Sequence, residues 1–372
     1  MKDDIELREI LRATAEQAAL PTVMPQLMRR KVALRRARTI GVTFLMTVAI
    51  AVGGLQGIRA VTLGEAAPGQ TADQPRVADQ KVEDLTDPNI RDMTPDTSAP
   101  KVPYLIDLKS RDMTPLPETI TQSLATDRFG PSRFAASPDG SSLAFVGEAS
   151  DGTPQIFTSG IDGTGVRQVT HDPTGAISPA WSPDGTKIAY VGNSSSFDGN
   201  LFVLDVRTGE ATKITDETGV SQPQFTPDGS SLLYAVYSIV EGVEAAELRT
   251  VPVSGGKSTL LFDPQARGFG YTGEGSLSPD GSLVTFMGHR IGGPGAIRFV
   301  ADADGTDWRS IGSCTSNPSG TWSPDGSRIV CGPNGPPPGI RVKNIATGHT
   351  TFVAKGRVAI WLDDHTLLVD VT

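Results

Sequence analysis

The stretch WSPDGTKIAY, residues 181–190, joins a tight-turn sequence to a segment with alternating apolar residues. Proline presets φ for a type I turn, serine and aspartate hydrogen-bond the turn backbone, and glycine accepts a positive φ. The alternation that follows is typical of a half-buried β-strand. Each copy of such a stretch therefore predicts two antiparallel strands connected by a tight turn.

The same turn sequence recurs in the C-terminal part of the chain. Ser-Pro-Asp-Gly or Thr-Pro-Asp-Gly occupies residues 137–140, 182–185, 226–229, 278–281 and 323–326, at spacings of 45, 44, 52 and 45 residues. A degenerate sixth copy starts at Trp361, where WLDDHTLLV aligns without gaps on WSPDGSRIV from Trp322. Four short antiparallel strands in about 45 residues are typical of one propeller blade.

One blade is expected to combine segments from both ends of the repeat region. The sixth copy supplies only two strands, and Tyr104–Leu108 matches the third strand of another repeat, Leu201–Val206. Met113–Leu116 would add the fourth strand. We therefore predict an all-β, six-bladed β-propeller of four-stranded antiparallel blades over residues 102–372.

The pattern WSPDG…IAY…LFVLD…TGE…KIT, within residues 181–215, resembles the TolB-like β-propeller repeat family of WD-type or PD-type repeats. The resemblance extends over residues 102–372. It implies a six-bladed propeller of a kind that is often secreted or bound to the cell envelope and that mostly binds proteins. An apolar segment stands where the type member of that family has an α/β domain.

Composition argues against several functional classes. The chain has 33 Lys and Arg against 42 Asp and Glu, a net charge of −9, whereas nucleic-acid binding favours basic surfaces. Two cysteines are too few for a cysteine-based zinc cage, and the four histidines are far apart in the sequence. No G-x-S-x-G nucleophile motif is present. We expect no catalytic residues, no metal site and no cofactor.

The N-terminal region predicts a membrane anchor. Residues 1–39 carry nine basic and five acidic residues, and residues 40–59 contain a run of apolar residues that is long enough to span a bilayer. Six cations lie on one flank of this run: Arg29, Arg30, Lys31, Arg35, Arg36 and Arg38. Such a flank stays in the cytoplasm, which would place the C-terminal propeller outside the cell membrane. A cleaved secretory signal peptide is the alternative.

Two further N-terminal segments have distinct patterns. Residues 3–20 read as a short amphipathic helix that either lies on the membrane or docks a cytoplasmic partner. Residues 60–101 are rich in polar residues and are expected to form a flexible extracytoplasmic linker. Arg-Asp-Met-Thr-Pro occurs at residues 91–95 and again at residues 111–115.

Blade geometry places short turns at one end of the propeller and longer, more varied loops at the other. Binding residues collect in variable loops on a rigid scaffold, so we expect the long-loop face to bind the ligand. Its candidate residues are His171, Asp172, Asp198, Arg267, Phe269, Tyr271, His289 and Arg290. This mixture of aromatic, acidic and arginine side chains suits a protein or peptide contact, and ordinary solvated loop residues are the alternative.

Cys314 and Cys331 both belong to the fifth repeat. Cys314 precedes the first strand of that repeat, and Cys331 ends the second strand, which returns to the same end of the blade. Outside the membrane the compartment favours oxidised thiols. We expect a disulfide, with two buried free thiols as the alternative.

Three functions remain open from the sequence. The first is a membrane-anchored propeller that binds a protein or peptide in the bacterial cell envelope. The second is a transmembrane, anti-sigma-like regulator with the propeller as its sensor and residues 1–39 as its output. The third is an envelope lyase or hydrolase that uses the long-loop face.

Overall fold

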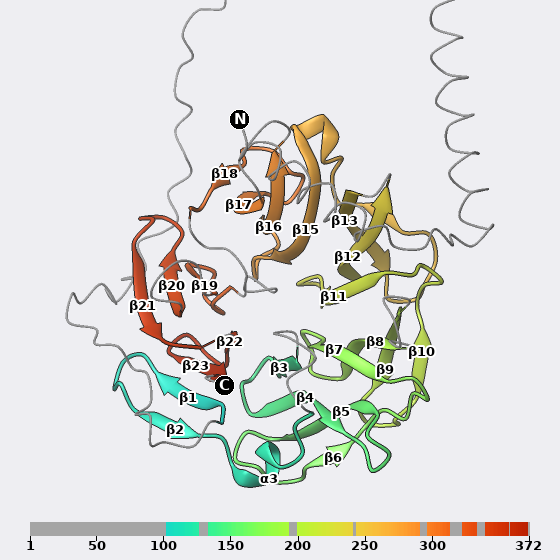
Figure 1. Ribbon diagram of the computed structural model, residues 1–372, viewed down its shortest axis with the longest axis vertical. Helices are drawn as coiled ribbons and strands as arrows, with labels where there is room; N and C mark the ends of the chain where they lie inside the picture. The colour runs from blue at the N-terminus through green and yellow to red at the C-terminus, as the bar shows by residue number, and fades with distance from the viewer. Residues whose placement is uncertain are drawn as a thin grey trace, which may run out of the picture. The chain divides into compact units, whose positions relative to one another are not determined.

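The computed structural model describes most of the repeat region as a β-propeller, with six small sheets around a central axis (Figure 1). The described residues are 102–370, without residues 126–132, 193–198, 241–242, 291–295, 313–321, 333–338 and 357. The predicted cytoplasmic segment, anchor and linker, residues 1–39, 40–59 and 60–101, lie outside the described residues.

The first three blades along the chain are four-stranded antiparallel sheets. Blade 1 contains β3 (Phe134–Ala136), β4 (Ser142–Glu148), β5 (Pro154–Gly160) and β6 (Arg167–Gln168). Blade 2 contains β7 (Ala176–Trp181), β8 (Lys187–Gly192), β9 (Asn200–Asp205) and β10 (Ala211–Lys213). Blade 3 contains β11 (Val220–Phe225), β12 (Ser231–Val240), β13 (Val243–Pro252) and β14 (Thr259–Leu260).

The next two blades repeat this order. Blade 4 contains β15 (Phe269–Leu277), β16 (Leu283–Arg290), β17 (Ala296–Asp302) and β18 (Arg309–Ser310). Blade 5 contains β19 (Arg328–Cys331), β20 (Ile340–Asn344) and β21 (Thr350–Ala354). A bridge between Trp322 and Ile329 stands where the first strand of blade 5 is expected. The predicted all-β fold with six blades is confirmed.

Blade 6 joins distant parts of the chain. Its sheet order is β2-β1-β23-β22, built from β1 (Tyr104–Asp107), β2 (Met113–Pro115), β22 (Val358–Trp361) and β23 (Thr366–Asp370). The pairing of Leu105 with Leu368 lies in the middle of the β1–β23 ladder. Helix α3 (Glu118–Thr121) then leads into blade 1. Segments more than 250 residues apart thus hold the ring closed.

The hydrophobic core lies between the blades. Among the described residues there are six clusters of buried apolar side chains, and each draws on two successive blades. The cluster between blades 6 and 1, for example, packs Ile360 and Leu368 against Phe134 and Leu143. Alternate residues of each strand face one neighbour or the other because the side-chain period of a strand is two. Each blade is therefore stable only between its neighbours.

A buried ion pair joins the two ends of the propeller. The Arg133 guanidinium, just before β3, binds the carboxylate of Asp370 at the end of β23. Both side chains are almost fully buried, and the guanidinium also lies over the Phe134 ring at 5.0 Å. Leaving either charge alone would be costly in this environment. The pair therefore fixes the register of blade 6 against blade 1.

Helices are scarce in the described part of the chain. Within those residues, no helix has both the length and the apolar character needed to cross a membrane. The predicted anchor at residues 40–59 falls outside this range and stays a prediction.

A glycine pair tests how tightly the ring is closed. A Cβ added to Gly140, at φ +68°, would lie 2.7 Å from the carbonyl oxygen of Leu362 in blade 6, whereas one added to Gly165, at φ +63°, would meet nothing within 4 Å. Gly165→Ala should lower the free energy of unfolding by about 1–2 kcal/mol, because alanine is strained in the left-handed backbone conformation. Gly140→Ala should lower the free energy of unfolding, measured by chemical denaturation, by clearly more than this, because blade 6 must also move to make room for the Cβ. Equal losses would show that the two blades are not in tight contact.

Candidate functional site

The five Pro-Asp-Gly turns form a ring around one mouth of the central channel, which we call the turn end. Within each turn the Ser or Thr hydroxyl donates to the Asp carboxylate at 2.5–2.6 Å. Each glycine has φ between +67° and +73°. The turns thus have one geometry repeated around the axis.

Successive turns also contact one another. A Cβ built on Gly185, Gly229, Gly281 or Gly326 would lie 3.4–3.9 Å from the proline of the preceding turn: Pro138, Pro183, Pro227 or Pro279. The degenerate turn of blade 6 continues the ring, because the Asp325 amide donates to Asp364 Oδ1 at 2.8 Å. On its other side, the carbonyl oxygen of Leu362 lies close to Gly140 in the turn of blade 1. The mouth is therefore framed by six turns in mutual contact.

These turns hold their carboxylates ionised. The Ser137 hydroxyl, followed by the Ser141 amide, lowers the pKa of Asp139 to about 2. Equivalent bonds from Ser182 and Thr226 lower the pKa values of Asp184 and Asp228 to about 2. Hydrogen bonds to the charged form account for this direction. The rim of the mouth consequently carries fixed negative charge, while the turn prolines face the channel.

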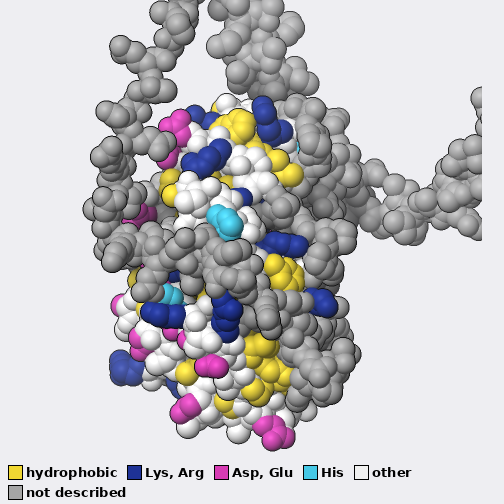
Figure 2. Space-filling view, turned by 90° about the vertical axis from the view of Figure 1, so that its left-hand side faces the viewer, with side chains coloured by type: hydrophobic (Ala, Val, Ile, Leu, Met, Phe, Trp, Pro, Cys, Tyr) yellow, Lys and Arg dark blue, Asp and Glu magenta, His cyan; other side chains and the backbone are white. Residues whose placement is uncertain are grey.

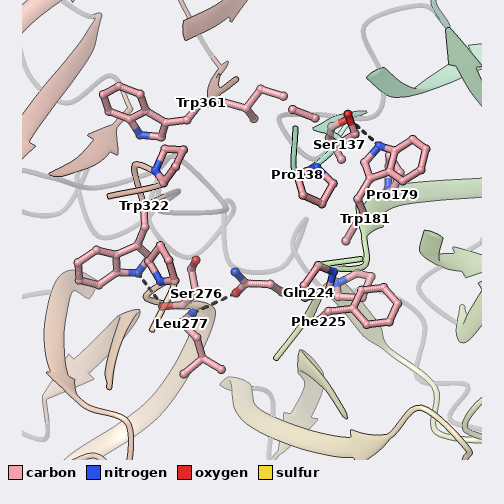
Figure 3. A pocket seen from close by; sticks show the side chains of 18 of the residues that line it. Ser137, Pro138, Pro179, Trp181, Gln224, Phe225, Ser276, Leu277, Trp322 and Trp361 are labelled. Atoms are coloured by element: carbon pink, nitrogen blue, oxygen red, sulfur yellow. Dashed lines mark hydrogen bonds between the residues drawn. The ribbon is translucent and has the colours of Figure 1, made fainter. Parts of the chain in front are cut away.

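A cavity of about 410 Å³ lies at the turn end, inside the ring. It is lined by the last residues of the innermost strands and by the turns that follow them, among them Trp181, Trp322, Trp361 and Phe225 (Figure 3). All five turn prolines also line it: Pro138, Pro183, Pro227, Pro279 and Pro324. No described lining residue has an ionisable side chain. The lining of the cavity is therefore uncharged, and the turn aspartates form an acidic rim around its mouth.

Two tryptophan indole groups form hydrogen bonds between neighbouring blades along the cavity wall. Trp181 Nε1 donates to the carbonyl of Ala135 at 3.2 Å, and Trp322 Nε1 donates to the carbonyl of Ser276 at 3.1 Å (Figure 3). Both bonds link the residue before a turn to the equivalent strand of the preceding blade. Between blades 3 and 4, Gln224 Oε1 instead accepts from the Leu277 amide at 3.0 Å. The aromatic wall is thus held in place by main-chain groups.

Strained backbone marks the inner wall of the cavity. Ser178, Gln222 and Glu274 have φ of +56°, +52° and +49° at equivalent positions of β7, β11 and β15. Each strand carries a β-bulge there. Non-glycine residues in this conformation are uncommon and cluster at functional sites. Gln222 is a lining residue of the cavity. Its Oε1 atom is buried away from the cavity surface and has no hydrogen-bond partner in the described part of the structure.

The cavity offers recognition groups rather than reactive groups. Among the described residues no cluster of His, Cys, Asp and Glu could hold a metal ion. The side of the molecule in Figure 2 shows basic, acidic and apolar side chains interspersed on the described surface. A neutral, aromatic and proline-lined cavity can bind an apolar segment.

The predicted residues His171 and Asp172 lie in the crossover between β6 and β7. Gln155 Nε2 donates to the Asp172 carbonyl at 2.6 Å, and the Asp172 amide donates to Gln155 Oε1 at 3.1 Å. Burial, helped by the Asp172 charge, raises the pKa of Tyr190 to about 12. His171 is exposed, with Nδ1 3.0 Å from Gln168 Nε2. Asp172 therefore anchors the crossover to blades 1 and 2.

Phe269, which was predicted to lie on the long-loop face, is buried in the core. Its side chain is 0% exposed and packs edge-on against Phe286, Phe299 and Trp308. The residue begins β15 with its ring toward the core, so strand register buries it. Arg267 donates to the carbonyl of Asp304 at 3.4 Å, in the turn between β17 and β18, which is at the turn end.

The remaining long-loop candidates belong mainly to blade 4. The β15–β16 ladder pairs Tyr271 with His289; the Tyr271 side chain lies outside the description. His289 is partly buried, and the exposed Arg290 stacks over the Trp308 ring at 4.7 Å. Asp198 is not among the described residues. The structure thus gathers part of the predicted set on one blade and separates it from His171 and Asp172.

Cys331 ends β19 and is 2% exposed. No cysteine is free in the described part of the chain, which agrees with a disulfide. Cys314 lies outside the described residues, so its pairing with Cys331 stays a prediction.

The repeats match a known family. PD40, the TolB beta propeller domain, matches residues 159–359, which are 201 of the 372 residues. The chain belongs to this family. A comparison with curated proteins finds no match.

Solved structures with this fold are distant in sequence. TolB from Acinetobacter baumannii is 17% identical, with a TM-score of 0.51, over 72% of this chain and 63% of that protein. A putative TolB from Agrobacterium tumefaciens is 18% identical, with a TM-score of 0.45, over 57% of this chain and 74% of that one. An oligogalacturonate lyase in complex with manganese is 18% identical, with a TM-score of 0.46, over 68% and 70%. At these identities, the TolB likeness concerns the fold alone.

Sequence reasoning missed the cavity because it weighted variable loops above repeated turns. The signal was nevertheless present. Residues at equivalent positions of a closed repeat must form a ring, so the bulky residue before each turn and the proline within it converge on one mouth. Trp181, Trp322 and Trp361 share that position.

The indole bonds predict a specific loss of stability. Trp181→Phe and Trp322→Phe each keep an aromatic ring but remove one donor between blades. Each should lower the free energy of unfolding by about 1 kcal/mol in chemical denaturation, and the double variant by the sum, because the bonds lie at different interfaces. Phe225 shows that the position accepts phenylalanine. An unchanged stability in both variants would assign the indoles no role in holding the wall.

The turn aspartates predict an acid-sensitive ring. Their pKa values are lower in the folded state than the ordinary value of 3.8, so their contribution is complete above about pH 4 and is lost as pH falls toward 2. Melting temperatures measured from pH 6 to pH 2 should fall less steeply in a variant with Asp139→Asn, Asp184→Asn and Asp228→Asn. Parallel curves for the variant and the native chain would contradict this assignment.

Proposed function

We propose that this protein is a membrane-anchored, extracytoplasmic propeller that binds a protein or peptide partner of the bacterial cell envelope through the cavity at the turn end. The observation that carries the proposal is the uncharged lining of that cavity. Aromatic and proline side chains recognise extended apolar segments, and peptide grooves of this composition are common.

The innermost strands add main-chain recognition. β7, β11 and β15 are each paired on one side only, so their other edges face the channel. Unpaired strand edges are templates for an added segment. The N–H and C=O groups along such an edge can pair with the main chain of an extended peptide. A peptide therefore fits both the side-chain and the main-chain groups of the wall.

The sequence supports the anchored location. The apolar run at residues 40–59 follows six cations, and that flank orients a span with its N-terminus in the cytoplasm. The repeat region would then lie outside the membrane, where the family fold is compatible with a binding role. The acidic rim of Asp139, Asp184 and Asp228 favours a partner with basic residues beside its apolar segment.

Cross-linking in intact cells tests the proposal. A membrane-impermeant cross-linker is applied to cells that express the full-length chain, and co-purified proteins are identified by mass spectrometry. An envelope protein should be captured by the native chain and lost with Ala180→Lys, because Ala180 is a partly exposed lining residue and a buried lysine charge is costly.

The matched control is Ala211→Lys on β10, an exposed outer strand away from the cavity. It should leave capture within about twofold of the native level. Equal capture by both variants would show that the partner binds outside the cavity. Reaction with the cross-linker only after cell lysis would instead place the propeller on the cytoplasmic side.

A further inference from the structure

The charges of the repeat region are unevenly distributed along the chain. Residues 102–372 contain 29 Asp and Glu against 19 Lys and Arg. Residues 308–362, which run from the end of blade 4 through blade 5 to β22, contain one acidic and six basic residues. The acidic residue is Asp325, whose carboxylate already binds the Arg328 guanidinium at 3.4 Å. Blade 5 is therefore a basic blade in an acidic propeller.

Three of these cations lie on one side of blade 5. Val342 packs in the core between blades 5 and 6. Neighbouring residues of a strand point to opposite faces, so Arg341 and Lys343 of β20 face blade 4. Arg309, on the outer strand β18 of blade 4, reaches toward them, because its Nη2 donates to the carbonyl of Ile345 at 3.5 Å. We call Arg309, Arg341 and Lys343 the basic patch.

The charges of the basic patch are available to a ligand. Arg309 is exposed and Lys343 is partly exposed, and neither forms an ion pair with any described residue. Lys343 Nζ donates to the Gly348 carbonyl at 3.0 Å, which is a neutral group. Arg341 lies over the Phe352 ring at 5.6 Å, and this contact fixes the position of its guanidinium. An anion can therefore approach all three cations from the outer side of the blades.

One carboxylate on this side opposes the patch. Asp302 shares a strand face of β17 with Val300, whose side chain packs between blades 4 and 5. The Asp302 carboxylate accepts from Thr306 Oγ1 at 3.4 Å. Three cations thus face one carboxylate, and the exposed Lys355 follows directly after β21. The balance of charge on this side stays positive.

The chain enters the propeller next to blade 5. Val102, where the described part of the chain begins, packs on the cluster that contains Ile340 and Val342 of that blade. β1 then starts blade 6 at Tyr104. If residues 40–59 span the membrane, as the proposed function holds, the chain that leads from the membrane reaches the propeller at blades 5 and 6. A tether at this point raises the effective concentration of the bilayer surface at the basic patch.

The acidic turn end restricts how the propeller can meet such a surface. Asp139, Asp184 and Asp228 are exposed and ionised there, so an anionic surface would repel the mouth of the channel. The outer strands of the blades lie on the circumference of the ring, away from the channel axis (Figure 1). Contact through blade 5 would keep the acidic rim away from the surface. The mouth would then open along the membrane and stay accessible to a partner.

We propose that the basic patch docks the propeller on an anionic lipid bilayer. The proposal rests on the membrane anchor of the proposed function and adds the orientation of the propeller on that membrane. Blade 5 lies on the side that faces the viewer in Figure 2, where several Lys and Arg side chains reach the surface. Each cation held near an anionic bilayer strengthens the contact by roughly fivefold, so three cations suffice for a tethered domain.

Full-length protein in bilayer discs tests the proposal. One set of discs contains phosphatidylcholine, and the other an equal mixture of phosphatidylcholine and phosphatidylglycerol, each with a trace of lipid that carries a nitroxide on its headgroup. A fluorescent amino acid replaces Ala346, in the exposed turn of blade 5, or Ala211 on β10 of blade 2, across the ring. Quenching at position 346 should be at least about threefold stronger in the anionic discs, and about 0.5 M salt should abolish the difference. Quenching at position 211 should be weak in both.

Charge variants assign the effect to the patch. Arg309→Gln with Lys343→Gln removes two cations and keeps Arg341 on its aromatic ring. It should weaken quenching at position 346 in anionic discs by at least about threefold. The matched control, Arg207→Gln with Lys213→Gln, removes two exposed cations of blade 2 and should leave that quenching unchanged. Thermal denaturation reports whether both variants remain folded.

Equal quenching in the two kinds of disc, or at positions 346 and 211, would overturn the proposal. Binding of soluble polyphosphate to the patch without any effect of lipid charge would overturn it too, in favour of a polymeric ligand. A chain that fails to elute with the discs would refute the membrane anchor of the proposed function as well. Loss of the lipid effect in an inserted chain would leave the binding role of the cavity untouched.

Discussion

Contact between successive turns at the channel mouth is the constraint on which the rest of the structure depends. Each turn meets the next through a proline, a glycine or a main-chain amide, and the glycine φ values vary by only a few degrees. The core clusters between blades require their neighbours, so a blade cannot pack alone. Closure therefore depends on blade 6, where β23 near the C-terminal end meets β1, and where Arg133 and Asp370 bury their charges together.

The same ring produces the candidate binding site. Because the turns repeat, the residue before each turn and the proline within it face one cavity, and their chemistry becomes the chemistry of the wall. Two tryptophans bond to the preceding blade, which keeps their rings in place before any partner arrives. Bulges in β7, β11 and β15 interrupt the pairing of each innermost strand with its neighbour beside the cavity. A rigid, preformed wall lowers the entropic cost of binding a peptide.

The fold could be predicted from the sequence because its signals are local. Pro-Asp-Gly specifies a turn through its own φ preferences, and the six copies of the repeat predict the number of blades. The site could not be predicted in the same way. The bond from Trp181 to Ala135 spans 46 residues and depends on how two blades pack. Phe269 looked like a loop residue because its crossover is long, yet β15 begins at that residue and turns its ring into the core. Asp198 and Cys314 lie outside the described residues and remain predictions.

The central claim is that a partner outside the membrane contacts the cavity at the turn end. The most direct measurement places a photoreactive amino acid at Ala136, which lines the cavity from β3, or at Ala211 on the outer strand β10, in full-length protein in living cells. The account predicts that light attaches one envelope protein at position 136 and not at position 211. Attachment at position 211 alone, or of the same protein at both positions equally, would contradict it.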